Sequence, residues 1–125
     1  KALELVRAVH AARSKNALSP KIRKCVHYIH VHLHEKITVH TLASYVGLSD
    51  DYLSVLFKKE TGKSFVGYLT DYRMEKAARM LVETGEKSYM IAKSVGYSDP
   101  NYFSYVFKRS YGVSPSKYRT EYAEN

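Results

Sequence analysis

"TLASYVGLSDDYLSVLFKKETGKS", residues 41–64, is followed by a second version of the same pattern, "MIAKSVGYSDPNYFSYVFKRSYGVS", at residues 90–114. In both copies a short apolar segment leads to a glycine. A second segment then places Tyr, Ser, Phe, Lys and Gly at the same spacing. The later copy has one extra residue, which falls in the turn. A helix, a turn that contains glycine and a second helix form the helix-turn-helix arrangement, so the repeat predicts two such units.

Capping residues divide the rest of the chain into helices, and no segment alternates between apolar and polar residues as a strand would. Ser19 and Pro20 are a cap and a first helical residue, and residues 20–34 carry one apolar stripe. Ser64 predicts the start of a long helix that ends near Thr84. We therefore expect an all-α fold of two helix-turn-helix subdomains joined by a long linker helix. Its parts would be a linker or the end of a preceding domain at 1–18, the first subdomain at 19–63, the connecting helix at 64–84 and the second subdomain at 85–125.

The same signals predict how the helices begin, end and pack. Thr38, Ser49 and Asp99 are expected N-caps, and Gly47 and Gly62 are expected to end helices. Positions at core spacing are Leu42, Ala43, Phe57, Ile91, Phe107 and Tyr118. Most tyrosines at helical core or semi-core spacing are also expected inside, namely Tyr45, Tyr68, Tyr72, Tyr102 and Tyr118.

Composition limits the kind of partner. The 125 residues include 20 Lys and Arg against 12 Asp and Glu, which favours a polyanion, either nucleic acid or an anionic membrane. One cysteine, Cys25, excludes an internal disulfide framework and fits a reducing cytosol. No apolar run approaches the roughly 20 residues that a membrane span needs. The chain starts at Lys1 without a visible signal peptide, so we expect it to be a piece of something longer.

The second helix of each repeat has one polar side that carries cations. A helix that enters the major groove needs this layout, because its first residues reach base edges while its cations and cap N–H groups reach phosphates. The alternative is an ordinary solvated face with cations at the negative end of the helix dipole. Two copies at one spacing in a basic chain favour DNA binding. The outward positions are Asp50, Asp51, Ser54, Val55, Lys58 and Lys59 in the first copy, and Pro100, Asn101, Ser104, Tyr105, Lys108 and Arg109 in the second.

Patterns of catalysis and metal binding are weak. His27, His30 and His34 share a helical stripe at a spacing that zinc sites use, but only Glu35 lies nearby, which favours a polar helix flank. Cys25 has no acid–base partner in the sequence and is expected to be a core residue. There is no Gly-rich phosphate loop, paired-carboxylate motif or Ser/His/Asp order. We therefore expect no metal, no cofactor and no enzyme.

Three segments carry a resemblance that covers about residues 20–120: "LASYVGLSDDYLSVLFKKETGKSF", "YRMEKAARML" and "IAKSVGYSDPNYFSYVFKRSYGVSPSKYR". They resemble the C-terminal DNA-binding domain of the AraC/XylS family of bacterial transcription regulators. The resemblance implies a separate sensing or receiver domain, with residues 1–16 as the end of that connection. It also implies seven helices, near 20–34, 39–46, 50–61, 64–83, 88–95, 100–111 and 115–123.

The resemblance also implies roles for single residues. The family often has Arg where this chain has Val55 and Tyr105, so the common Arg–guanine contact is missing; Val55 could touch a thymine methyl, and Asn101 could pair with adenine. Arg73 and Arg119 could be phosphate ligands or partners of nearby acids. The implied base readers are Asp51, Ser54, Val55, Pro100, Asn101, Ser104 and Tyr105. The implied phosphate ligands are Ser49, Lys58, Lys59, Lys63, Ser98, Lys108 and Arg109.

These patterns together predict a cytoplasmic, sequence-specific double-stranded DNA-binding domain of a transcription regulator, expected to be an activator. Both recognition helices would lie in successive major grooves, and the partners would be operator DNA and RNA polymerase, with no membrane. One alternative is a helical protein-interaction module whose basic face binds an acidic partner, but it has no reason to repeat the same spacing. Another is an enzyme fused to such a domain, as in alkyl-transfer repair proteins; the lack of a motif-embedded reactive cysteine counts against it.

Overall fold

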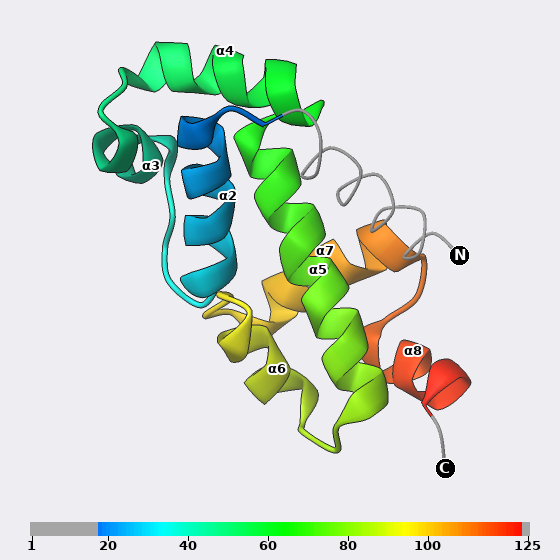
Figure 1. Ribbon diagram of the computed structural model, residues 1–125. Coiled ribbons are helices and arrows are strands. Elements are labelled where there is room, and N and C mark those ends of the chain that lie inside the picture. The colour runs from blue at the N-terminus through cyan, green and yellow to red at the C-terminus, as the bar shows by residue number, and fades with distance from the viewer. Residues whose placement is uncertain (1–17, 124–125) are drawn as a thin grey trace. The chain divides into compact units, whose positions relative to one another are not determined.

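The computed structural model describes residues 18–123, which form seven α-helices and no strand (Figure 1). This confirms the all-α prediction with two helix-turn-helix units and a long helix between them. The first helix ends earlier than residue 34, and the expected linker segment, residues 1–18, lies outside the described residues apart from Leu18. The helices are α2 (Pro20–Val31), α3 (Val39–Val46), α4 (Asp50–Thr61), α5 (Phe65–Glu83), α6 (Ser88–Ser94), α7 (Pro100–Tyr111) and α8 (Pro115–Tyr122).

The chain divides into two compact units, with the boundary between Thr70 and Asp71. The long helix α5 crosses this boundary and contributes its first turns to one unit and the rest to the other. The first unit contains α2, α3 and α4, and the second contains α6, α7 and α8. Each unit thus has one helix-turn-helix pair, α3–α4 or α6–α7.

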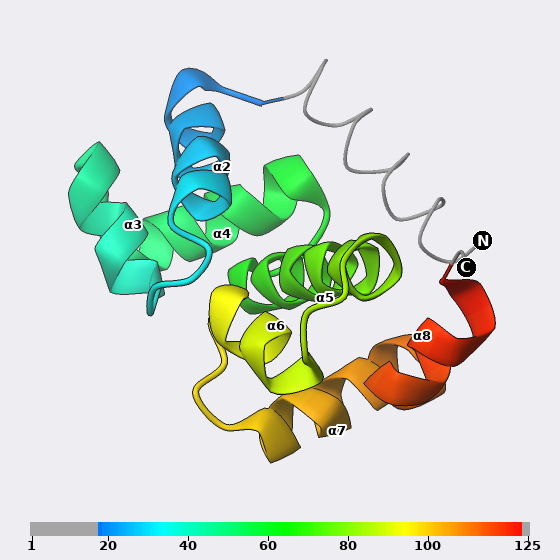
Figure 2. The same ribbon diagram turned by 90° about the horizontal axis from the view of Figure 1, so that it is seen from below.

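In the first unit α2, α3 and α4 pack against one another (Figure 2). Phe57 of α4 is fully buried and meets the start of α5, where the rings of Phe65 and Tyr68 lie edge-on to it at 6.1 and 5.4 Å. The other fully buried large side chains of this unit are Ile22, Ile29, Leu33, Leu42 and Leu53. The predicted core positions Leu42, Ala43 and Phe57 are confirmed.

In the second unit one apolar cluster joins α5, α6 and α7. It consists of the buried residues Met74, Ala77, Ala78, Leu81, Ile91, Ala92, Val95, Phe103 and Phe107. Tyr118 of α8 is half-buried and lies edge-on to the ring of Phe107 at 5.4 Å. The predicted core residues Ile91 and Phe107 are confirmed, and Tyr118 packs at the edge of the cluster.

The predicted N-caps of the repeated helices are confirmed. Ser49 Oγ accepts a hydrogen bond from the Tyr52 backbone N–H at 3.2 Å, and Asp99 Oδ1 accepts one from the Asn101 N–H at 2.9 Å. Thr38 forms a capping box at the start of α3. These bonds satisfy N–H groups that have no partner inside the helix.

Ser19 is the N-cap residue of α2, as predicted, and its carbonyl accepts the Arg23 N–H at 2.9 Å, but its side chain makes no capping hydrogen bond. Its hydroxyl donates to Glu60 Oε2 at 2.9 Å, and its backbone N–H donates to Glu60 Oε1 at 2.7 Å. A hydrogen bond to a carboxylate is stronger than one to a neutral group, which accounts for the choice of partner. The interaction ties the start of α2 to the end of α4.

Two of the tyrosines expected inside are on the surface. Tyr45 is 54% exposed and Tyr102 is 56% exposed, so the prediction is wrong for both. Tyr45 contacts the Tyr28 ring at 5.0 Å, and Tyr102 contacts Tyr105 at 6.2 Å. Aromatic pairs of this kind shield one another without entering the core. Tyr68 is buried, and Tyr72 and Tyr118 are half-buried.

Gly47 ends α3 with φ 73°, in the left-handed region, although a Cβ at this position would meet no atom within 4 Å. We therefore expect Gly47→Ala to lower the free energy of unfolding by about 1–2 kcal/mol through backbone strain alone. Gly85→Ala is the matched control, because its Cβ also meets nothing within 4 Å and its φ is not positive. Denaturant unfolding followed by circular dichroism measures both. Equal effects of the two substitutions would contradict the explanation.

Candidate nucleic-acid interface

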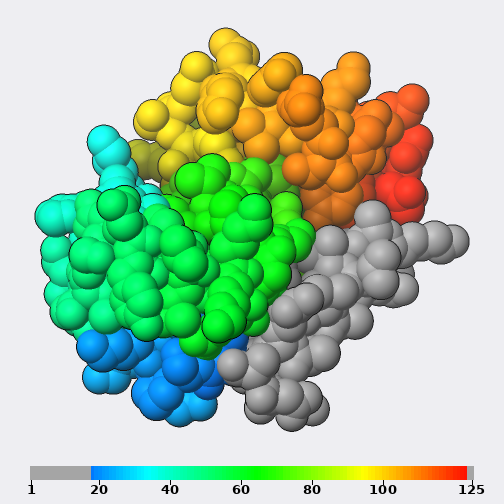
Figure 3. Space-filling view, turned by 90° about the horizontal axis from the view of Figure 1, so that it is seen from above, coloured from blue at the N-terminus to red at the C-terminus, as the bar shows by residue number. Residues whose placement is uncertain are grey.

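α4 turns one side into the core and presents the other to solvent. Leu53, Phe57 and Thr61 are buried, as expected for residues spaced by four on one face. The predicted outward positions are all exposed: Asp50, Asp51, Ser54, Val55, Lys58 and Lys59. Figure 3 shows the side chains of α4 at the surface of the first unit. The structure therefore places the predicted base readers and cations of this copy on one accessible helix face.

The first turn of α4 makes a side-chain contact that the sequence did not predict. His40 Nδ1, from the start of α3, lies 3.1 Å from Asp50 Oδ1, and both side chains are exposed. The two residues are ten positions apart, and only the tight turn between the helices brings them together. The contact engages one of the two acids in the first turn of α4.

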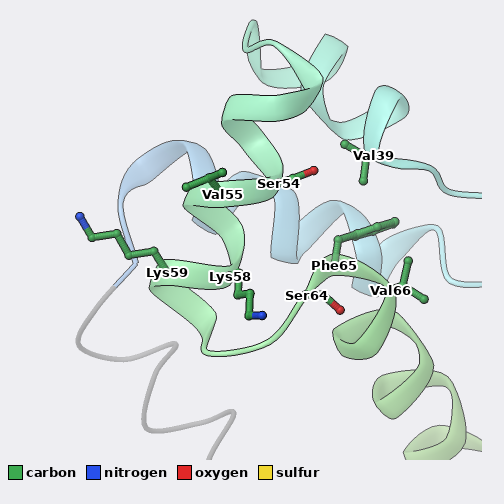
Figure 4. A pocket seen from close by; sticks show the side chains of 8 residues that line it. All are labelled: Val39, Ser54, Val55, Lys58, Lys59, Ser64, Phe65 and Val66. Atoms are coloured by element: carbon green, nitrogen blue, oxygen red, sulfur yellow. The ribbon is translucent and has the colours of Figure 1, made fainter.

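An apolar hollow of about 550 Å³ adjoins the outward face of α4 (Figure 4). Three elements form it: α4, the start of α3 and the first turn of α5. In Figure 4, Lys58 extends between α4 and the start of α5, while Lys59 points to the other side of α4. Its lining residues are Val39, Ser54, Val55, Lys58, Lys59, Ser64, Phe65 and Val66. Four of the predicted site residues thus meet at one hollow, which sequence spacing alone did not reveal.

α7 repeats this arrangement in the second unit. Phe103 and Phe107 are buried, while Pro100, Asn101, Tyr105, Lys108 and Arg109 are exposed and Ser104 is half-buried. Lys108 and Arg109 lie in the last turn, where the helix dipole favours cations.

Tyr105 and Arg109, a predicted base reader and a predicted phosphate ligand, contact each other. The guanidinium carbon lies 5.8 Å from the ring centroid, and Arg109 Nη1 is 3.5 Å from Tyr105 Oη. The Tyr102 ring stacks on Tyr105 from the other side. Tyr102, Tyr105 and Arg109 therefore form an exposed row on α7, whereas the sequence analysis had assigned Tyr102 to the core.

The remaining predicted phosphate ligands lie at the ends of the two recognition helices. Ser49 is exposed and caps α4, so its hydroxyl hydrogen can still be donated outward. Ser98 is exposed in the turn before α7. Lys63 is half-buried just after α4. Each of these residues therefore flanks the outward face of its own unit.

The two arginines whose role was open have partners within the second unit. Arg73 places its guanidinium carbon 5.6 Å from the centroid of the Tyr97 ring. Burial lowers the pKa of Arg73, and its hydrogen bond with Tyr97 opposes this shift. Arg119 donates to main-chain carbonyls at and after the end of α5, those of Leu81, Thr84 and Glu86. Arg119 thus joins α8 to the end of α5 through these hydrogen bonds.

Of the three histidines predicted on one helical stripe, His27 and His30 lie on α2 and His34 lies in the turn after it; all three are exposed. Within residues 18–123, no group of three His, Cys, Asp or Glu side chains is placed to hold a metal ion. Glu35 instead accepts a hydrogen bond from His32 at 3.0 Å and lies 3.6 Å from His34. These contacts, first the hydrogen bond from His32, lower the pKa of Glu35. Among the described helices, none is both long and apolar enough to cross a membrane.

Comparison with known proteins identifies the kind of chain. A family model described as a helix-turn-helix domain matches residues 42–121. The lactose operon transcription activator of Staphylococcus xylosus is 36% identical over 104 residues, which are 83% of this chain and 37% of that protein. The chain spans 35%, 38% and 32% of the length of three further curated relatives that it matches.

Solved structures agree in fold. The C-terminal domain of AraT, a response regulator from Geobacillus stearothermophilus, is 40% identical with a TM-score of 0.84, and the match covers 86% of this chain and 90% of that one. The DNA-binding domain of AdpA, a global transcriptional factor solved in complex with a target DNA, is 28% identical with a TM-score of 0.79. That match covers 82% of this chain and 93% of the AdpA chain.

Cys25, the only cysteine, lies inside the first unit on α2 and is completely buried. Burial raises the pKa of its thiol to about 11, because the apolar surroundings disfavour the thiolate. The thiolate is the reactive form, so this residue does not have the properties of a nucleophile. Its position agrees with the expectation of a small core residue.

A thiol reagent checks this assignment. At pH 8 we expect Cys25 of the folded chain to react with Ellman's reagent at least ~100-fold more slowly than in 6 M guanidinium. In the unfolded chain the thiol has an ordinary cysteine pKa of about 8.5, so a much larger fraction of it is the reactive thiolate. The absorbance of the released chromophore gives both rates. Comparable rates in the two conditions would show an accessible, ionised thiol.

Proposed function

The chain belongs to the AraC/XylS family of helix-turn-helix transcription regulators, and we propose that it binds double-stranded DNA sequence-specifically as the DNA-binding part of a bacterial regulator. One observation carries this proposal: α4 and α7 repeat the same exposed face, with small or polar residues first and two cations in the last turn. If these were ordinary solvated helices, there would be no reason for the same layout to occur in both units. The family is one of transcription regulators rather than enzymes, and docking requires no cofactor.

The first turns of the two helices would read the bases. Recognition helices contact base edges with residues near their N-termini, and α4 and α7 expose Asp51 and Asn101 there. Asn pairs with the N6 and N7 groups of adenine, and a carboxylate accepts from the amine of cytosine. Ser54, Val55, Pro100, Ser104 and Tyr105 complete the proposed set.

The cations and caps would hold the phosphates. Lys58 and Lys59 end α4, and Lys108 and Arg109 end α7, so each helix carries two positive charges in its last turn. Phosphate contacts fix register and orientation without reading sequence. Ser49, Lys63 and Ser98 are the further proposed ligands, at the margins of the same faces.

The linker helix supports the use of both copies. α5 is one continuous helix of 19 residues, about 28 Å long at 1.5 Å per residue. One turn of B-DNA is about 34 Å. We propose that α4 and α7 enter successive major grooves, with α5 as the helical connection between their units.

The whole protein would be larger than this chain. AraT is a response regulator and the Staphylococcus xylosus relative is a transcription activator, which supports an N-terminal sensing or receiver domain and a role in activation. RNA polymerase would then be the second partner, and the cytoplasm the location, because the operator is there.

A binding measurement tests the proposal. We expect the chain to enrich one group of related sequences from a random duplex library. Its affinity for an enriched duplex should fall on the order of 10³-fold between 50 and 200 mM salt, because several cations release condensed counterions. Fluorescence anisotropy with a labelled duplex gives the dissociation constants. Binding that ignores salt, or that favours single strands, would contradict the proposal.

Two alanine variants separate base reading from phosphate binding. Asn101→Ala should cost roughly 1–3 kcal/mol at one base pair and little elsewhere, whereas Lys58→Ala should weaken all duplexes about equally. The measurement uses a panel of single-base variants of the enriched duplex. Lys24→Ala is the control, because Lys24 is an exposed lysine of α2. If Asn101→Ala weakened every duplex equally, Asn101 would not be a base reader.

A further inference from the structure

We propose that α4 recognises thymine through its 5-methyl group, which enters the apolar hollow beside Val55. The inference rests on the proposed function, because it requires α4 to enter a major groove. It goes further by naming a base that this helix selects and the surface that receives it.

The outward face of α4 has few groups that can discriminate bases by hydrogen bonding. The sequence of the helix, DDYLSVLFKKET, has no Arg, Asn or Gln, so two lysines are its only residues of the types that make bidentate contacts to guanine or adenine. Both lysines lie in the last turn, away from the first turn that is proposed to read bases, and are proposed phosphate ligands. Ser54 can pair with either a donor or an acceptor, so it discriminates weakly. The remaining central residue is Val55, whose chemistry suits an apolar group on a base edge.

Val55 does not stand alone as an apolar side chain. It is 67% exposed, and Val66 on the first turn of α5 is 66% exposed on the same hollow. Val39 and the Phe65 ring complete the apolar wall, and Figure 4 shows the ring turned toward Val39. Within the major groove, the thymine methyl is the apolar group that a base edge presents. Burying the thymine methyl against this wall would remove apolar surface of both the base and the protein from water, which favours binding.

The charges around the hollow fit a DNA strand. Lys58 and Lys59 line it, and no acidic side chain does. A strand of duplex DNA presents methyl groups on base edges and anionic phosphates beside them, so apolar and cationic groups are required side by side. Asp51 lies one turn before Val55 on the same face and suits the amine of a cytosine. A strand that contains thymine and cytosine is therefore the best match to α4.

Replacing thymine by deoxyuridine tests the inference, because it removes only the methyl group and keeps every hydrogen-bonding group. The probe is a duplex enriched by the chain from a random library, with each thymine replaced in turn. We expect one thymine whose replacement weakens binding about fourfold, the effect of losing one buried methyl-sized group. In Val55→Ser, the duplexes with thymine and with deoxyuridine at that position should bind equally well. In Val66→Ser, the ratio of the two affinities should fall below fourfold.

Val31→Ser is the matched control, because Val31 is an exposed valine of the same unit, 53% exposed on α2, and does not line the hollow. Val31→Ser should keep the fourfold ratio between the affinities for the thymine and deoxyuridine duplexes. Circular dichroism checks that all three variants fold. Failure to enrich any duplex would overturn the proposed function together with the inference. An enriched duplex with no sensitive thymine, or an unchanged ratio in Val55→Ser, would overturn the inference alone. The hollow would then be open to another occupant, such as an acidic amphipathic peptide.

Discussion

The packing of one phenylalanine in each repeat determines what the recognition helix can present. Phe57 and Phe107 are fully buried, and each is surrounded by aromatic rings of its own unit: Phe65 and Tyr68 in the first, Phe103, Tyr111 and Tyr118 in the second. Burying such a side chain contributes about 1.5–3 kcal/mol. Because successive residues of a helix are about 100° apart, fixing the direction of this ring also fixes the direction of every other side chain of the helix.

The outward residues follow from that rotational position. Lys58 and Lys108 come directly after the buried rings and point out of the core, and Ser54 and Ser104 precede the rings by three positions. The caps Ser49 and Asp99 decide where each helix begins, and hence which residues lie in the first turn next to the positive end of the dipole. The composition of each outward face thus depends on a few interactions made by residues outside that face.

Local signals were sufficient to predict most of the fold. The caps, the αL glycines and the buried phenylalanines act within a few residues, so the repeat alone located α3, α4, α6 and α7. Contacts between distant residues were missed: Glu60 attracts Ser19 from 41 positions away, and Arg119 reaches carbonyls near the end of α5. The pairing of His40 with Asp50 and the hollow beside Val55 likewise arise only when separate helices meet. Tyr45 and Tyr102 were misassigned because their spacing suits a core position, whereas each is more than half exposed and packs against another tyrosine at the surface.

The two copies use one scaffold for different surface chemistry. Their buried positions and cations nearly coincide, but α4 exposes Asp51 and Val55 where α7 exposes Asn101 and Tyr105. Substitutions at exposed helix positions usually change stability by no more than about 0.5 kcal/mol, whereas changes to the buried rings cost several times as much. The outward residues can therefore differ between the copies, while the buried rings keep each helix in the same rotational position. Under the proposed function, the two faces would recognise two unlike groups of bases, which a symmetric pair of identical helices could not do.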